Sequence, residues 1–199
     1  MKIREYSGSD KQSWIECRVL SFLDSSYFDD VQNFREEYDN PVIQMVAVDD
    51  GKVVGFLDCE YEKIAGDVCY FKGERGGVIW HLGVLPAYRK QGIANQLWEA
   101  TKEKLSAVGI ARVEVWTQDD AAATAWYRKN NFKFREAYLN AFIKGTAQDK
   151  VIQKYVNLPK IGEIYGIRNF NFEAPIERKE ELAKICYRLH EVRVYESQL

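Results

Sequence analysis

The sequence has no apolar run that approaches the ~18 consecutive residues of a membrane-spanning helix, so we expect no membrane partner. Its N-terminal stretch, MKIREYSGSD, lacks the apolar core of a secretory signal peptide. The four cysteines stand far apart and include no C-x-x-C pair, which is typical of reduced thiols rather than of a disulfide framework. Together these absences favour a cytoplasmic protein.

Neither sign of charge dominates the composition. The chain has 28 Lys and Arg against 30 Asp and Glu, a net charge of −2 and a pI of about 5.8. It therefore lacks the positive field that would attract nucleic acid, and any bound anion needs a local site. The sequence holds only two histidines and no Cys, His and Asp residues at metal-ligand spacing, so we also expect no metal.

The length of 199 residues suits one globular domain, 1–199, that buries its own core. Residue patterns predict strands over 2–6, two runs within 41–61, 77–84, 112–116 and 132–142. They predict helices after a cap at Ser9 and over 26–38, 92–105 and 120–129. The clearest local signal is Asp50-Gly51, because this pair tolerates the positive φ of a tight hairpin turn.

The tail from 145 to 199 is less regular. Pro175 followed by nearby glutamates predicts a short helix, because anionic side chains favour a helix N-terminus. Alternation over 187–195 indicates a closing strand, but apolar residues over 182–189 suit a continued helix equally well. Residues 166–173 fit an added strand, an acceptor pocket or a subunit interface.

Residues 83–94, GVLPAYRKQGIA, place two cations directly before a predicted helix. A helix N-terminus has unpaired backbone N–H groups that attract anions, and a glycine there lets a phosphate approach closely. A pyrophosphate held by amides from about Gln91 to Ala94, beside Arg89, fits this stretch, and a solvated basic turn fits it as well. The glycine patterns of dinucleotide-binding folds and of phosphate loops are absent.

The stretch also resembles a known family. Its spaced residues are similar to the acetyl-CoA signature [QR]-x-x-G-x-[GA] of the GNAT superfamily of N-acetyltransferases; they are Val84, Pro86, Arg89, Gly92 and Ala94. A second block resembles the family element N-x-x-A-x-x-x-Y-x-x-x-G-F, through Asp120, Ala123, Tyr127 and Phe132. The likeness covers roughly 1–144. It departs at Asp120, where Asn is common, and at Asn131, where Gly is usual.

The resemblance implies an α/β (α+β) fold with a mixed, mostly antiparallel central sheet and helices on both faces. In the family the fourth and fifth strands splay apart, and the pantetheine arm of acetyl-CoA runs between them. The tail 145–199 would then be an extension packed on this core.

The resemblance also implies a set of cofactor-binding residues. These are the strand residues Leu82, Gly83 and Val84, the turn residues Arg89, Lys90, Gln91, Gly92, Ile93 and Ala94, and the helix residues Asp120 and Tyr127. Tyr127 is in addition a catalytic candidate. The leaving thiol has a pKa of about 8.5 and a phenol one near 10, so a nearby tyrosine can stabilise or protonate the thiolate. Without the family pattern, Tyr127 reads as an aromatic packing residue.

Several residues are candidates for the base that takes the proton of the acceptor amine. His81 lies on the cofactor-binding strand and has a suitable intrinsic pKa, although it alternates with its neighbours and would then face away from the cleft. Glu114 on the next strand is the second candidate. Glu60 and Asp58 are rivals, a structural role suits each of these side chains, and a route through bulk water needs none of them.

We therefore predict an enzyme that transfers the acetyl group from acetyl-CoA to a primary amine by direct attack on the thioester. A non-catalytic acyl-CoA-binding or sensory domain is the main alternative, and a nucleotide-binding module is a weaker one. The acceptor would be a small-molecule amine or a peptide or protein amine, and the protein a monomer or homodimer. Carboxylates within 24–39 suit a cationic acceptor or a solvated helix face.

Overall fold

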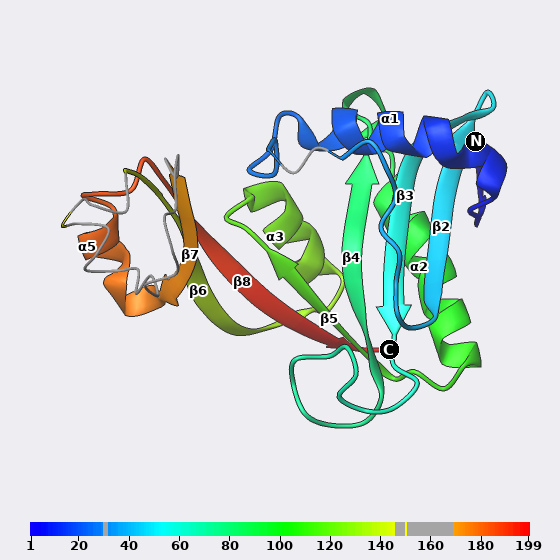
Figure 1. The fold of residues 1–199 in the computed structure, drawn as a ribbon. Helices are drawn as coiled ribbons and strands as arrows, with labels where there is room; N and C mark the ends of the chain where they lie inside the picture. Colours follow the sequence, from blue (N-terminus) through cyan, green and yellow to red (C-terminus); the bar gives the residue numbers. More distant parts are fainter. Residues whose placement is uncertain (30–31, 146–149, 151–168) are drawn as a thin grey trace, which may run out of the picture. The chain divides into compact units, whose positions relative to one another are not determined.

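The computed structural model describes residues 1–29, 32–145, 150 and 169–199 (Figure 1). Its strands are β1 (Lys2–Glu5), β2 (Val42–Asp49), β3 (Lys52–Tyr61), β4 (Gly76–Val84), β5 (Arg112–Thr117), β6 (Lys133–Lys144), β7 (Asn169–Pro175) and β8 (Arg188–Gln198). Its helices are α1 (Lys11–Phe22), α2 (Ile93–Ala107), α3 (Ala121–Lys129) and α5 (Lys179–Leu182). The strand order is β1-β2-β3-β4-β5-β8-β6-β7. These residues form two compact units, Met1–Arg135 with Val194–Leu199, and Glu136–Arg193.

Antiparallel pairs from β1 to β4 build most of the sheet in the first unit. The turn between β2 and β3 has positive φ at Asp50 (46°) and Gly51 (73°), as the Asp-Gly signal predicts. Side chains on β3 alternate between the two faces. Phe56 packs in a cluster with Trp14 of α1, whereas Leu57 packs in a cluster with Leu97 of α2. The predicted mixed sheet with helices on both faces is therefore confirmed.

The parallel pairing of β4 with β5 is short. It joins Gly76–Ile79 to Arg112–Val115. Beyond these pairs the two strands separate, although β4 continues to Val84 and β5 to Thr117. On its other side β4 pairs with β3, and there the register shifts: Ile79 faces Cys59 but His81 faces Asp58. Trp80 is the extra residue of a β-bulge, which reverses the alternation of the residues after it.

Two local predictions are wrong. Residues 26–29 and 32–38 form turns, bends and irregular chain instead of the predicted helix. Tertiary contacts override the helical pattern, because Arg35, Glu36 and Tyr38 all turn into one buried polar cluster described below. Ser9 does not cap α1: a 3-10 turn precedes that helix, and Asp10 accepts the backbone N–H of Ser7 at 2.8 Å.

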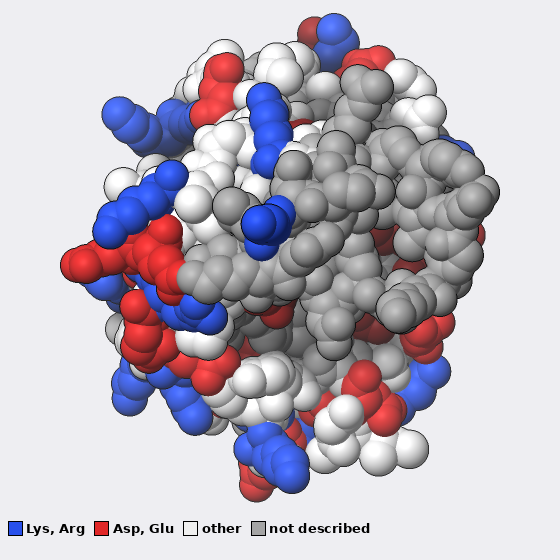
Figure 2. Space-filling view, turned by 60° about the vertical axis from the view of Figure 1, so that its left-hand side comes forward, with Lys and Arg blue, Asp and Glu red and all other residues white. Residues whose placement is uncertain are grey.

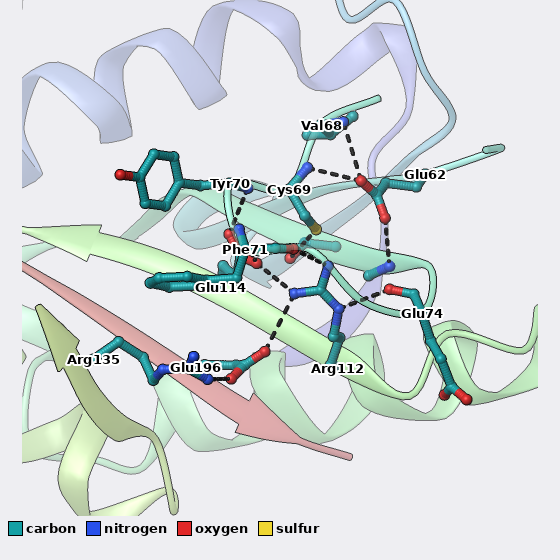
Figure 3. Close-up of polar contacts among 12 residues, drawn as sticks. Glu62, Val68, Cys69, Tyr70, Phe71, Glu74, Arg112, Glu114, Arg135 and Glu196 are labelled. Atoms are coloured by element: carbon teal, nitrogen blue, oxygen red, sulfur yellow. Dashed lines mark hydrogen bonds and ion pairs between the residues drawn. The ribbon is translucent and has the colours of Figure 1, made fainter. Parts of the chain in front are cut away.

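Buried charges fix the long connection between β3 and β4 (Figure 3). The carboxylate of Glu62 accepts the backbone N–H groups of four residues in or after this loop, Gly66, Val68, Cys69 and Gly76, at 2.8–3.2 Å. Burial opposes the charged form of Glu62, but these donors hold its pKa below the usual range. In the second half of the loop, Glu114 accepts two further backbone N–H groups, and Arg112 donates to the backbone carbonyl of Phe71. The loop is therefore tied to the sheet through its backbone.

The second unit contains the antiparallel pair of β6 and β7, with Tyr138 opposite Pro175 and Lys144 opposite Asn169. Its apolar cluster includes Leu139 and Leu182. The predicted short helix after Pro175 is present as α5, and Arg188–Gln198 forms the closing strand rather than a continued helix. Part of the predicted tail, 146–149 and 151–168, lies outside the described residues.

Charges of both signs are mixed on the face of the described residues that Figure 2 shows. On the face shown in Figure 2, basic and acidic side chains of the described residues alternate, and they form no extended area of one sign. Among the described residues no helix is long and apolar enough to cross a bilayer. The same residues place no three His, Cys, Asp or Glu side chains together as metal ligands.

The close approach of β4 to the core at Gly83 gives a first prediction. A Cβ at Gly83 would lie 2.5 Å from Cζ of Phe56, so Gly83→Ala should lower the free energy of unfolding by about 1–3 kcal/mol through overpacking. Urea denaturation measures this, with Gly8→Ala as the control because its Cβ would meet nothing within 4 Å. Equal stability of the two variants would contradict the packing described for β4.

Candidate functional site

Two cavities in the first unit share one wall. The first has a volume of about 430 Å³ and the second about 380 Å³. Both are lined by the end of β4, by the turn after it and by α3; the shared residues are Leu82, Gly83, Val84, Arg89, Ala122, Ala123 and Tyr127. The wall lies where β4 and β5 have parted. A bound molecule can therefore reach the same few atoms from either side.

The first cavity contains the N-terminus of α2. Gly92 precedes the helix with φ of 80°, and open space surrounds the position where its Cβ would be. The first turn of α2 has no acidic residue and no capping side chain, so its N–H groups are available to an anion in the cavity. Gly92, Ile93 and Ala94, which the sequence predicts to bind the cofactor, line this cavity. The residues present thus fit a phosphate-bearing guest.

The predicted cations differ in their placement. Arg89 lines both cavities, and its guanidinium donates to the backbone carbonyls of Val84 (3.1 Å) and Ser21 (2.8 Å). It ties the turn to the end of α1 as well as adding charge. Lys90 lines the first cavity with a positive φ of 62°. Gln91 is not among the lining residues; its amide donates to the carbonyl of Ala87 instead.

Tyr127 stands in the shared wall. It is buried, its ring stacks on Tyr195 with centroids 6.1 Å apart, and it lies edge to face with the Phe132 ring at a centroid distance of 5.3 Å. Burial raises the pKa of Tyr127 above its usual value, and the nearby Tyr27 and Asp120 add to this shift. The side chain therefore remains a neutral phenol, able to donate a hydrogen bond, at neutral pH.

Asp120 caps the helix that carries Tyr127. Its Oδ1 accepts the backbone N–H groups of Ala122 (2.7 Å) and Ala123 (3.0 Å), and the residue lines the second cavity. The capping bonds need only an acceptor, so a carboxylate can replace the amide common in the family.

The second cavity combines aromatic rings and carboxylates. Phe22, Tyr27 and Trp80 contribute rings, and Asp24 and Asp120 contribute negative charge. Arg89 is the arginine of the described lining, and its guanidinium donates to the two carbonyls already named. His81 also lines this cavity, but Glu36 and Asp58 face its ring and compensate its charge when it is protonated. Aromatic faces and carboxylates attract a positively charged group. This cavity therefore suits a cationic molecule.

His81 lines the second cavity and is held by a buried charge cluster. Its Nε2 lies 3.3 Å from Glu36, and its Nδ1 lies 3.7 Å from Asp58 and 3.3 Å from the hydroxyl of Tyr38. Arg18 pairs with Glu36 at 3.2 Å, and the cluster continues behind Asp58. The bulge at Trp80 turns His81 to this face, toward the cavity, instead of away from it.

Asp58 is the most deeply buried carboxylate of the cluster, with an exposed fraction of 1%. It pairs with Arg35 at 3.1 Å, and the guanidinium of Arg35 lies over the ring of Tyr6 at 3.7 Å and over that of Trp14 at 4.4 Å. A buried charge needs such partners, because desolvation alone would disfavour it strongly.

The cluster shifts the protonation of His81. Burial lowers the pKa of this histidine, but hydrogen bonds to Asp58 and Glu36 and their charges outweigh burial and raise it. Conversely, burial opposes the charged form of Glu36, but the His81 imidazolium and Arg18 lower the pKa of Glu36 to about 2. The carboxylates therefore favour the imidazolium form of His81 more than burial alone would allow.

The structure does not bring the other base candidates into the site. Glu114 is fully buried outside both cavity linings, where it pairs with Arg112 and accepts two backbone N–H groups of the β3–β4 loop. Glu60 accepts the N–H of Asn40 and the indole N–H of Trp80. Both carboxylates hold neighbouring elements together, and neither lines a cavity from which it could take a proton.

Sequence reasoning missed several residues of the site. In the first cavity, Trp126 donates its indole N–H to Asn95 at 2.7 Å, and Lys129 adds a cation to the lining. In the charge cluster, Arg18 is 1% exposed although its neighbours on the buried face of α1 include Trp14 and Cys17. The sequence did contain a signal for Arg18, because a cation lies there at helical spacing among the apolar residues of that face.

Comparisons with known proteins agree with this geometry. Residues 11–132 match the model of the acetyltransferase (GNAT) family. An acetyltransferase of Sodalis glossinidius (strain morsitans) is 27% identical over 144 residues, 70% of this chain and 92% of that protein. The PaiA N-acetyltransferase of Thermoplasma acidophilum, solved in complex with coenzyme A, has a TM-score of 0.54 at 19% identity, covering 67% of this chain and 90% of its own. An N-acetyltransferase of Staphylococcus aureus has a TM-score of 0.58 at 13% identity, covering 99% and 97%.

The charge cluster predicts how His81 titrates. In the folded protein its NMR titration midpoint should lie above the ordinary value of about 6.5, and Glu36→Gln should lower it. Because the folded pKa is raised, the stability contributed by this group is present below about pH 6.5 and is lost as pH rises through the folded pKa. The stability advantage of the wild type over Glu36→Gln should therefore shrink at alkaline pH.

The control for this measurement is Glu37→Gln, which removes an exposed neighbouring carboxylate and should leave the midpoint unchanged. An equal midpoint in wild type and Glu36→Gln would show that Glu36 does not hold His81.

Proposed function

Because this chain belongs to the acetyltransferase (GNAT) family, we propose that it transfers the acetyl group of acetyl-CoA to an amine across the wall that the two cavities share. The cofactor enters from the first cavity and the acceptor amine from the second. The observation that carries this proposal is the shared wall itself, which contains the end of β4 and Tyr127 and is reached from both sides.

The residues of the first cavity suit coenzyme A. The free N–H groups at the start of α2 bind the pyrophosphate, and Lys90 and Arg89 supply positive charge beside it. Beyond the last β4–β5 pair, the backbone of Leu82–Val84 has no β5 partner and is open to an extended polar chain. The pantetheine arm supplies such a chain.

The reacting amine must first lose a proton. An alkylamine with a pKa of about 10.4 is mostly protonated at pH 7, and exposing its lone pair there costs about 4.6 kcal/mol. The carboxylates and rings of the second cavity bind the ammonium form. His81 in its neutral form accepts the proton, directly or through water, and the carboxylates behind it stabilise the imidazolium that results.

The attack forms the C–N bond and places a negative charge on the thioester oxygen. Collapse of this intermediate breaks the C–S bond and frees a thiolate, and the nitrogen loses its remaining extra proton to water. A backbone N–H near Leu82 or Val84 stabilises the oxyanion, because it is fixed in the strand before the reaction begins. Tyr127 donates a hydrogen bond to the leaving sulfur. Its raised pKa makes full proton transfer to the thiolate less favourable than a charge-assisted hydrogen bond.

Removal of the phenol tests this assignment. Tyr127→Phe should lower kcat roughly 10- to 100-fold, because a positioned donor is lost, while the dissociation constant of coenzyme A should stay within about twofold. Turnover is followed by thiol release from acetyl-CoA and affinity by calorimetry. Tyr61→Phe is the control, since Tyr61 packs against the core and lines neither cavity. Unchanged kcat in Tyr127→Phe would remove this residue from the mechanism.

A further inference from the structure

Four aromatic side chains continue the second cavity across the sheet. They come from the β3–β4 loop, from β4 and from β5; we call them the aromatic strip, and they are Tyr70, Phe71, Trp80 and Trp116. Tyr70 meets Phe71 edge to face at 5.1 Å and Trp116 at 6.4 Å. Trp80 itself lines the second cavity. The strip therefore begins at the proposed acceptor site and leads away from it.

The strands place the two tryptophans on one face. Ile79 and Val115 are the last pair of β4 and β5, and Trp80 and Trp116 are the next residue of each strand. Trp80 donates its indole N–H to Glu60 at 2.8 Å, which fixes its ring on the face that carries the charge cluster. Trp116 points to the same face, because Val115 before it packs in the opposite core.

The other end of the strip, Tyr70 and Phe71, is held by the buried side chains of Glu114 and Arg112 (Figure 3). Glu114 accepts the backbone N–H groups of Tyr70 (2.8 Å) and Phe71 (3.1 Å), and Arg112 donates to the carbonyl of Phe71 at 2.7 Å. The guanidinium of Arg135 lies 4.4 Å from the centroid of the Phe71 ring. These contacts hold the backbone and leave the ring of Tyr70 pointing away from the ion pairs, as Figure 3 shows.

The strip is exposed in spite of this support. Tyr70 has an exposed fraction of 63% and Trp80 one of 48%. Neighbouring exposed rings on a rigid surface are typical of a binding site, since a single chain gains nothing from leaving them in water. A rigid ring also loses little conformational entropy when a flat group packs on it.

The charge of the adjoining cavity indicates the occupant. Asp24 and Asp120 attract a cation to the cavity, and the strip offers a flat apolar surface beside it. We infer that the preferred acceptor is an amine whose short carbon chain carries a flat apolar group, with the ammonium in the second cavity and the flat group on the strip. This inference rests on the proposed function, since it names the class of acceptor for the same site.

Two amines with one ammonium each test the inference by binding. Protein saturated with coenzyme A is titrated calorimetrically with ethylamine and with 2-phenylethylamine, which differ by the phenyl group. The dissociation constant should be about tenfold lower for 2-phenylethylamine, as expected for one aromatic contact of about 1.4 kcal/mol. Equal dissociation constants, or no detectable binding of either amine, would overturn the inference.

Variants assign the effect to the strip. Trp80→Ala removes the ring of the strip that lines the second cavity, and it should reduce the affinity ratio of the two amines severalfold, whereas Trp80→Phe keeps a ring there and should retain most of the ratio. Ile64→Ala is the control, because Ile64 is a 70% exposed residue of the β3–β4 loop outside the strip. A ratio unchanged in Trp80→Ala would sink the assignment.

Two further outcomes are distinguishable. If 2-phenylethylamine binds better but acetyl-CoA releases no thiol with either amine, the proposed function fails while the binding inference stands. If sedimentation shows a dimer that Tyr70→Ala dissociates, the strip is an interface between copies of the chain and the inference is wrong.

Discussion

Hydrogen bonding between β4 and β5 stops after Ile79 and Val115, although β4 continues to Val84. Backbone groups that a neighbouring strand would otherwise satisfy are left for another partner beyond this point. The start of α2 likewise has N–H groups without a cap. Both sets of unpaired groups line the same cavity, and Tyr127 closes it from α3. The binding capacity of the site thus follows from where a parallel pair ends.

A second constraint is the buried charge behind His81. Asp58 and Glu36 each have an arginine partner and also face the imidazole of His81. When His81 is protonated, the positive and negative charges of this cluster therefore offset one another. Its arginines come from α1 and from the segment after it. The cluster thereby fixes the irregular chain around Arg35 and positions a titratable group, His81, at the second cavity. The same ion pairs therefore hold this part of the fold and set the environment of His81.

Local signals in the sequence were sufficient to predict several turns and helix ends. Asp50-Gly51 predicted the hairpin, and Gly92 predicted the start of α2, because turns and helix ends depend on adjacent residues. The orientation of His81 was not predictable, since it depends on a bulge at Trp80 that appears only when β4 pairs with β3. The helix expected over 26–38 was wrong for the same reason: distant partners, not neighbouring residues, set that backbone.

The most direct test is amide hydrogen exchange with coenzyme A and, separately, with ATP. Both ligands carry phosphates, but only coenzyme A has a pantetheine arm to pair with β4. Coenzyme A should slow exchange at the start of α2 and at those amides of Leu82–Val84 that do not bond to β3, whereas any protection by ATP should be confined to α2. If coenzyme A left Leu82–Val84 unchanged, the gap between β4 and β5 would not be the cofactor site.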